Sequence, residues 1–85
     1  MNNTNNTASN IDRISLTTDD VRAAVLRDPS VRARIECCSI ACRIRGHMTT
    51  TGGYAVVIRG DHTAGAIAAR FYHRAGAEAF IAQCA

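Results

Sequence analysis

The spacing of apolar residues in the first half of the chain predicts two helices. Residues 17–20, Thr-Thr-Asp-Asp, form a typical helix start, in which a hydroxyl group caps the first turn and two acids follow. Apolar residues then recur at helical spacing up to Arg27. Residues 28–30, Asp-Pro-Ser, interrupt this pattern. Ser30 is a suitable cap for a second predicted helix over residues 31–45, which ends before a glycine.

The second half of the chain predicts a hairpin followed by a third helix. Residues 47–59 contain two short strand-like segments separated by Gly52-Gly53, a favourable two-residue turn. A helix is expected over residues 64–75, and residues 78–83 are expected to form a short strand or helical turn. The predicted fold is therefore α+β, with the element order α-α-β-β-α and a short closing element.

The predicted second helix is apolar on two opposite sides. On a helical wheel one stripe consists of Val31, Ile35, Cys38 and Cys42, and the opposite stripe consists of Ala33, Cys37, Ile40 and Ile44. One explanation is a central helix that is buried on both sides within one domain. A chain of 85 residues has little material to cover both sides, so we expect the second stripe to be an association interface.

Composition limits the size and class of the protein. The length of 85 residues fits one small domain, and the apolar fraction of 47% indicates that most of the chain folds. Residues 1–13, rich in Asn and Thr, are expected to be a disordered tail, and residues 14–85 are expected to be the domain. The sequence shows neither a signal peptide nor a long apolar run. We therefore expect a cytoplasmic protein with reduced thiols and no membrane partner.

The charge pattern favours a nucleic-acid partner. The net charge is +3, and all ten basic residues other than histidine are arginine. Arginine binds phosphate groups and base edges well, although a GC-rich genome produces the same bias. The candidate DNA-binding residues are Arg32, Arg34, Arg43, Arg45 and Arg59.

Cysteine and histidine offer weaker candidates for chemistry. Cys37, Cys38 and Cys42 carry the right donor atoms for zinc, but adjacent residues on a helix diverge by about 100°. We therefore expect these cysteines to be packing residues. His62 and His73 are candidate general bases, but no motif places a nucleophile beside either of them. The sequence therefore predicts no enzyme, no metal and no cofactor.

Several segments together resemble one known family. Residues 15–22, 36–38 and 40–48 resemble the N-terminal domain of the WhiA family of sporulation regulators. That domain has a similar helix start, a pair of cysteines and an apolar helix that ends in glycine. The resemblance continues through residues 51–53 and 66–72.

The resemblance implies half of a fold related to LAGLIDADG homing endonucleases. Residues 38–46 then occupy the nine positions of the motif, and Arg43 and Arg45 stand where acids would hold a metal ion. A guanidinium group repels Mg²⁺, so nuclease activity is not expected. The implied function is a non-enzymatic module in transcription regulation of sporulation and cell division, which acts through DNA or protein contacts.

The resemblance also implies partners. The second half of the endonuclease-like unit and the helix-turn-helix domain of the family have no counterpart in this sequence. We therefore expect a homodimer, or a full-length WhiA-type regulator, to cover the interface, with DNA as a further partner. One alternative is a winged-helix-like DNA-binding protein that uses Arg32 and Arg34. Another is a small metal-binding or redox protein that uses its cysteines.

Overall fold

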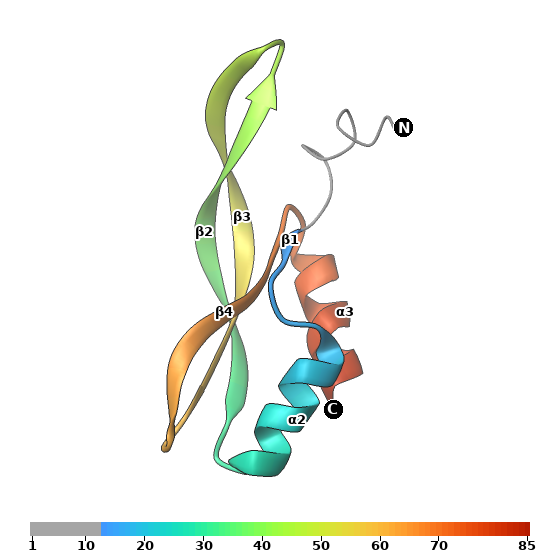
Figure 1. Ribbon diagram of the computed structural model, residues 1–85. Coiled ribbons are helices and arrows are strands. Elements are labelled where there is room, and N and C mark those ends of the chain that lie inside the picture. Colours follow the sequence, from blue (N-terminus) through green and yellow to red (C-terminus); the bar gives the residue numbers. More distant parts are fainter. Residues whose placement is uncertain (1–12) are drawn as a thin grey trace, which may run out of the picture.

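The computed structural model describes residues 13–85 and shows a layer of two helices against an antiparallel sheet (Figure 1). The strand order in the sheet is β1-β4-β3-β2, so β1 and β2 are the outermost strands. Both helices lie on one face of the sheet (Figure 1). The elements in chain order are β1 (Arg13–Ile14), α2 (Thr18–Arg27), β2 (Arg32–Ile44), β3 (His47–Gly60), β4 (Thr63–Phe71) and α3 (Arg74–Cys84).

The predicted order α-α-β-β-α, and with it the half LAGLIDADG-like unit, is wrong. Residues 31–45 do not form a helix, because Arg32–Ile44 is a strand. The predicted helix over residues 64–75 is mostly the strand β4, and the final segment is the helix α3. Residues 1–12 of the predicted tail lie outside the described residues, whereas Arg13 begins β1.

The predicted hairpin turn is also wrong. Strands β2 and β3 are joined by Arg45-Gly46, and Ile44 pairs with His47 on either side of the turn. Both turn residues have positive φ angles, 53° for Arg45 and 81° for Gly46. Two consecutive positive φ angles give a tight turn whose twist matches that of the flanking strands. Gly52 and Gly53, the predicted turn, lie within β3.

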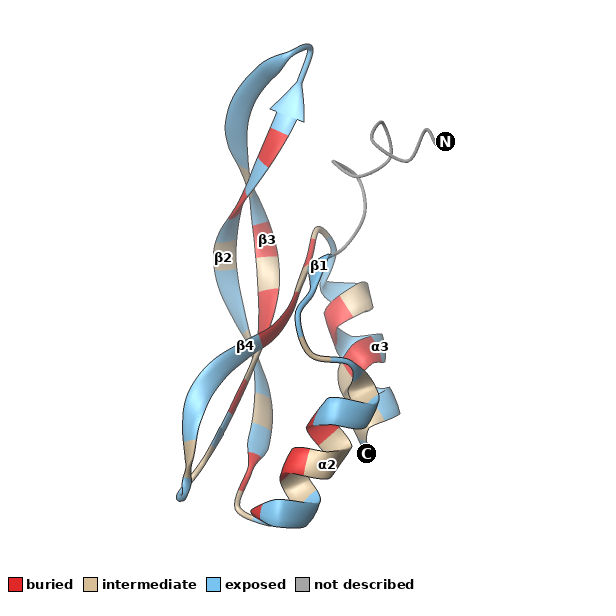
Figure 2. Ribbon diagram, in the orientation of Figure 1, coloured by how far each residue is buried: buried red, intermediate tan, exposed pale blue. Residues whose placement is uncertain are grey.

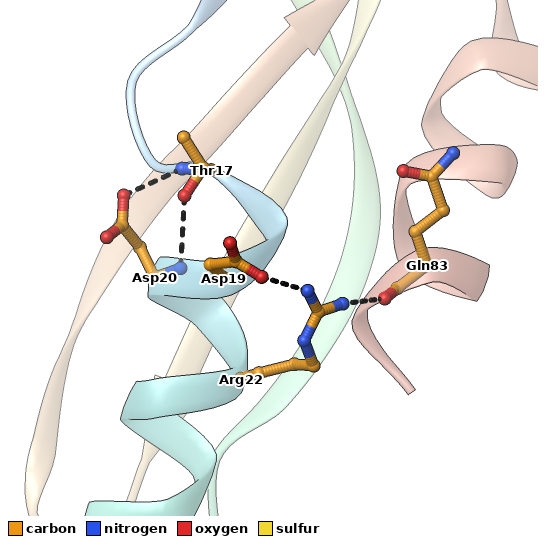
Figure 3. A network of polar contacts seen from close by, with 5 residues as sticks. All are labelled: Thr17, Asp19, Asp20, Arg22 and Gln83. Carbon is orange, nitrogen blue, oxygen red and sulfur yellow. Dashed lines mark hydrogen bonds and ion pairs between the residues drawn. The ribbon is translucent and has the colours of Figure 1, made fainter.

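The predicted start of the first helix is confirmed. Thr17 caps α2: its hydroxyl oxygen accepts a hydrogen bond from the Asp20 backbone N–H at 3.1 Å, and the Asp20 carboxylate accepts one from the Thr17 N–H at 2.8 Å (Figure 3). These bonds lower the pKa of Asp20. The Arg22 guanidinium donates to the Asp19 carboxylate and to the Gln83 carbonyl oxygen, and so ties α2 to the end of α3 (Figure 3).

The core lies between the helices and the face of the sheet that they cover. Ala68 and Ala69 are fully buried in β4, and their small side chains allow the helices to approach closely. The rings of Phe71 and Phe80 pack with their centroids 5.7 Å apart. The buried residues of this core are Val21, Val31, Val56, Ile58, Ala68, Ala69, Phe71, Ala77 and Phe80.

The sheet coils at the end where β1 begins. The Arg13 guanidinium donates a hydrogen bond to the Ala41 carbonyl oxygen, which joins the two outermost strands. Nearby, Ile40 is only 1% exposed, although its strand position places it on the face away from the helices. The Ile40 side chain lies against Gly53, where a side chain would also come within 2.8 Å of the Phe71 carbonyl oxygen. Gly53 is therefore needed for close packing within the strand.

Gly53→Ala is expected to lower the free energy of unfolding by about 1–3 kcal/mol, because the new methyl group meets a backbone carbonyl oxygen that cannot move aside. The matched control is Gly52→Ala, where nothing lies within 4 Å of the added carbon. This control should change the unfolding free energy by less than about 0.5 kcal/mol. Urea unfolding followed by circular dichroism measures both variants, and equal effects would contradict the assigned packing.

Candidate nucleic-acid interface

The face of the sheet away from the helices gathers arginines from all four strands. Along the first half of β2, exposed residues alternate with half-buried ones, and Ala33 and Ile35 pack against the core. Because successive side chains on a strand point to opposite faces, the residues between them lie on the other face. The strand pairings extend this assignment across the sheet. We call this face the outer face, and its arginines are Arg13, Arg32, Arg34, Arg59 and Arg70.

Arginines lie directly opposite one another across neighbouring strands of the outer face. Arg32 pairs with Arg59 across β2 and β3, and Arg13 pairs with Arg70 across β1 and β4. Like charges in directly opposed positions destabilise a sheet. Among residues 13–85, the four strands contain one carboxylate, Glu36, which lies 3.6 Å from the Arg34 side chain. The outer face is therefore strongly cationic, with little internal compensation.

Arg59 lies on β3, which stands between β2 and β4 in the sheet. Its guanidinium lies across β4 at Gly65, where an added side-chain carbon would stand 3.0 Å from the Nε and Nη2 atoms. Arg59 forms no ion pair or hydrogen bond within residues 13–85, whereas Arg32 donates to the backbone carbonyl oxygens of Pro29 and Val31. Two shallow hollows adjoin Arg59, with volumes of about 310 and 410 Å³.

The strand aromatic residues lie on the opposite side of the sheet. Tyr54 and Phe71 pack against the core, so within β1–β4 no aromatic ring is placed on the outer face. The residues between the arginines are small or aliphatic, as at Ala55, Val57 and Ile67. Without rings for bases to stack on, this face suits contact with the phosphates of a nucleic acid.

Beyond the end of β4, β2 and β3 continue as a two-stranded ribbon. The last pairing of β4 joins Phe71 to Tyr54, so residues 38–53 pair only with one another. We call these residues the arm; it rises well beyond the rest of the sheet in Figure 1. Seven residues per strand at about 3.3 Å each give a length of about 23 Å. The arm contains no carboxylate and carries Arg43, Arg45 and His47.

The end of the arm is open to solvent. Residues 43–50, which we call the tip, are all exposed (Figure 2). The Arg43 guanidinium donates a hydrogen bond of 3.3 Å to the Gly46 carbonyl oxygen, across the turn. This neutral acceptor leaves the charge of Arg43 uncompensated.

The structure brings together three of the five predicted DNA-binding residues. Arg32, Arg34 and Arg59 share the outer face, and Arg43 and Arg45 lie at the tip. Arg13 and Arg70 were missed, because only the pairing of β1 with β4 places them on the outer face. The alternative of a winged-helix recognition helix at Arg32 and Arg34 is wrong, since both residues lie on a strand.

The predicted interface stripe is also wrong, because its four residues do not share one face of β2. Ala33 and Cys37 lie on the core side of β2, whereas Ile40 and Ile44 lie on the other side, because a strand separates residues that a helix would align. The prediction that the cysteines pack is confirmed for Cys42, which is buried, but Cys37 is exposed. Within residues 13–85 no three potential metal ligands come together.

A buried carboxylate fixes the loops at the edge of the outer face. Asp28 is 6% exposed and accepts hydrogen bonds from the Ser30 hydroxyl at 2.6 Å, the Thr63 hydroxyl at 2.8 Å and the His62 backbone N–H at 3.0 Å. The Ser30 hydroxyl in turn accepts from the Asp61 N–H at 2.7 Å. The Ser30 and Thr63 bonds are the main cause of the lowered pKa of Asp28, which is about 2. His62, weighed above as a candidate base, contributes its backbone N–H to this cluster.

Comparison of the chain with protein-family models, curated proteins and solved structures found no match. The function implied by the WhiA resemblance therefore stays a prediction, while the fold implied by it is corrected above. Neither helix within residues 13–85 is long and apolar enough to cross a membrane.

Asp28→Asn is expected to destabilise the fold at pH 7. The neutral Asn amide cannot replace the charged carboxylate that accepts hydrogen bonds from Ser30, His62 and Thr63. Folding lowers the pKa of Asp28 from 3.8 to about 2. The stabilisation from its charge is therefore complete above pH 3.8 and is lost as the pH falls through the folded pKa near 2. The difference in unfolding free energy between wild type and variant should shrink over this interval.

Urea unfolding at a series of pH values between 7 and 2 measures this difference. The control is Asp61→Asn, since Asp61 uses its backbone rather than its side chain in the cluster. A wild-type advantage over Asp28→Asn that does not change with pH would contradict the assigned role of the carboxylate.

Proposed function

We propose that this chain is a non-enzymatic module that binds double-stranded DNA. The outer face contacts the phosphate backbone and the arm enters a groove. The observation that carries this proposal is the direct pairing of Arg32 with Arg59, beside Arg34, on a face that continues into a carboxylate-free arm. A polyanion relieves the repulsion between these guanidinium groups by supplying the charge that the protein itself lacks.

The shape of the arm favours DNA over RNA. A two-stranded β-ribbon can enter the major groove of B-form DNA, which is about 12 Å wide, or the minor groove of a duplex that bends. The major groove of an RNA duplex is deep and narrow and does not admit protein side chains, and its minor groove is shallow. Proteins that bind single strands usually stack bases on aromatic rings, and the outer face has none among its strand residues.

The regulatory part of the proposal comes from the WhiA resemblance. A non-enzymatic DNA-binding module is compatible with transcription regulation in sporulation and cell division. Association with a second copy, or with a full-length WhiA-type regulator, is supported by one feature of the sheet. Strand β2 is an outermost strand of 13 residues, and such an edge offers unpaired backbone groups to another chain.

Binding to a mixed-sequence DNA duplex should weaken steeply with salt, because arginines displace counterions from the phosphates. Arg59→Gln should weaken binding and reduce the slope of log K against log salt concentration by about 1. Fluorescence anisotropy of labelled DNA over a series of salt concentrations measures both quantities.

The matched control is Arg27→Gln, which removes an exposed arginine from the last turn of α2, in the helix layer. This variant should bind DNA with the wild-type slope. Equal slopes for Arg59→Gln and wild type, or tighter binding to an RNA duplex of the same sequence, would contradict the proposed interface.

A further inference from the structure

The tip of the arm exposes two large aliphatic side chains among its cations. Ile44 is 55% exposed and Met48 is 63% exposed. Ile44 pairs with His47 beside the turn, and Met48 pairs with Arg43 one step further back. The two aliphatic residues therefore lie on opposite faces of the ribbon. Each face of the tip carries one aliphatic side chain next to one basic side chain.

These side chains do not serve the fold of the domain. The core lies between the helices and the sheet, whereas the tip extends beyond the last pairing of β4 (Figure 1). Exposed threonines follow Met48 in β3, which shows that polar residues suit this ribbon. Aliphatic residues at its very end are explained by a partner that covers them.

The charges around the tip limit the chemistry of that partner. Arg43 and Arg45 flank Ile44 in the sequence, and no carboxylate occurs between Glu36 and Asp61. The partner must therefore present negative charge around an apolar interior. Duplex DNA has this arrangement, since its phosphates surround a stack of bases.

We propose that the tip enters the minor groove of DNA and that Ile44 wedges between two base pairs, an inference that rests on the DNA binding proposed above. A narrow minor groove has a strong negative potential that attracts arginine. Proteins that bend DNA from the minor groove insert apolar side chains, among them Ile and Met, between base steps. The two-residue turn at Arg45-Gly46 keeps the end of the arm narrow enough to lead the insertion.

Ile44 is the better wedge of the two aliphatic residues. It stands directly beside the turn, at the extreme end of the strand. Its β-branched side chain is stiff, so it loses little rotamer freedom on insertion. Met48 lies one residue further from the turn on the other face and contacts the sugar wall of the groove. The complex is therefore kinked by about 20–90°, preferentially at flexible pyrimidine–purine steps such as TA.

Energy transfer between dyes at the two ends of a duplex measures the bend. The duplex has about 30 base pairs with one central TA step, and a 2-aminopurine beside that step reports unstacking. Binding of the full chain is followed on the same samples by anisotropy. The variants are Ile44→Ala and Met48→Ala. The matched control is Leu26→Ala, which removes an exposed aliphatic side chain from α2, in the helix layer.

We expect wild type and Leu26→Ala to raise both the energy transfer and the 2-aminopurine fluorescence. Ile44→Ala should still bind at low salt but lose both signals, and Met48→Ala should reduce them less. Circular dichroism confirms that each variant is folded.

Binding without a bend in the wild type would overturn the wedge and leave the proposed DNA binding intact. A bend that survives Ile44→Ala, or one that Leu26→Ala removes equally, would also overturn it. Absence of binding to any duplex would instead contradict the proposed function, and the wedge with it.

Discussion

The pairing of β2 with β3 determines which side chains face the core and which face outward. It runs in one uninterrupted register from Arg32 opposite Arg59 to Ile44 opposite His47. A shift of one residue would exchange the two faces of β2, because side chains alternate along a strand. The register is fixed where Ala33, Ile35, Val56 and Ile58 of the two strands pack against the helices. The same register places the arginines on the outer face and continues along the arm, beyond the end of β4.

The placement of charge follows from this division of faces. Both helices cover the core side, so most of the hydrophobic contribution to folding comes from that side, and neither helix covers the outer face. There Arg32 and Arg59 face each other, and the backbone beneath Arg59 is bare at Gly65. The Asp28 cluster fixes the two loops at the edge of this face, which holds Arg32 and Arg59 in place without neutralising them. The fold thus separates the part that provides stability from the part that we propose to bind DNA.

Part of the fold and of the charged surface can be predicted from the sequence, and the rest depends on contacts between distant segments. The start of α2 is predictable because a capping threonine and an acid three residues later form a local signal. On a helical wheel, residues 31–45 show two opposite apolar stripes. Alternation of apolar and polar residues, which is the period of a strand, produces the same pattern. Residues 63–71 contain four alanines and favour a helix locally, but pairing with β3 and contact with the helices select the strand.

The position of the turn and the shared face of the arginines depend on the pairing of strands. Arg45-Gly46 is a weaker turn signal in the sequence than Gly52-Gly53, and only the pairing of β2 with β3 places the turn there. The charged surface was identifiable by residue type, whereas the shared face of Arg32, Arg59 and Arg70 depends on pairings between strands.

We propose DNA contact at two places that one strand register provides, a cationic face and a cationic arm. This contact is tested most directly by the amide spectrum of isotope-labelled protein, recorded while a DNA duplex is added. We expect the chemical shift changes to concentrate in residues 32–36 and 57–59 of the outer face and in residues 43–48 of the tip, with α2 and α3 little affected. Chemical shift changes concentrated in the two helices, or a spectrum that DNA leaves unchanged, would contradict the proposed DNA contact with the outer face and the arm.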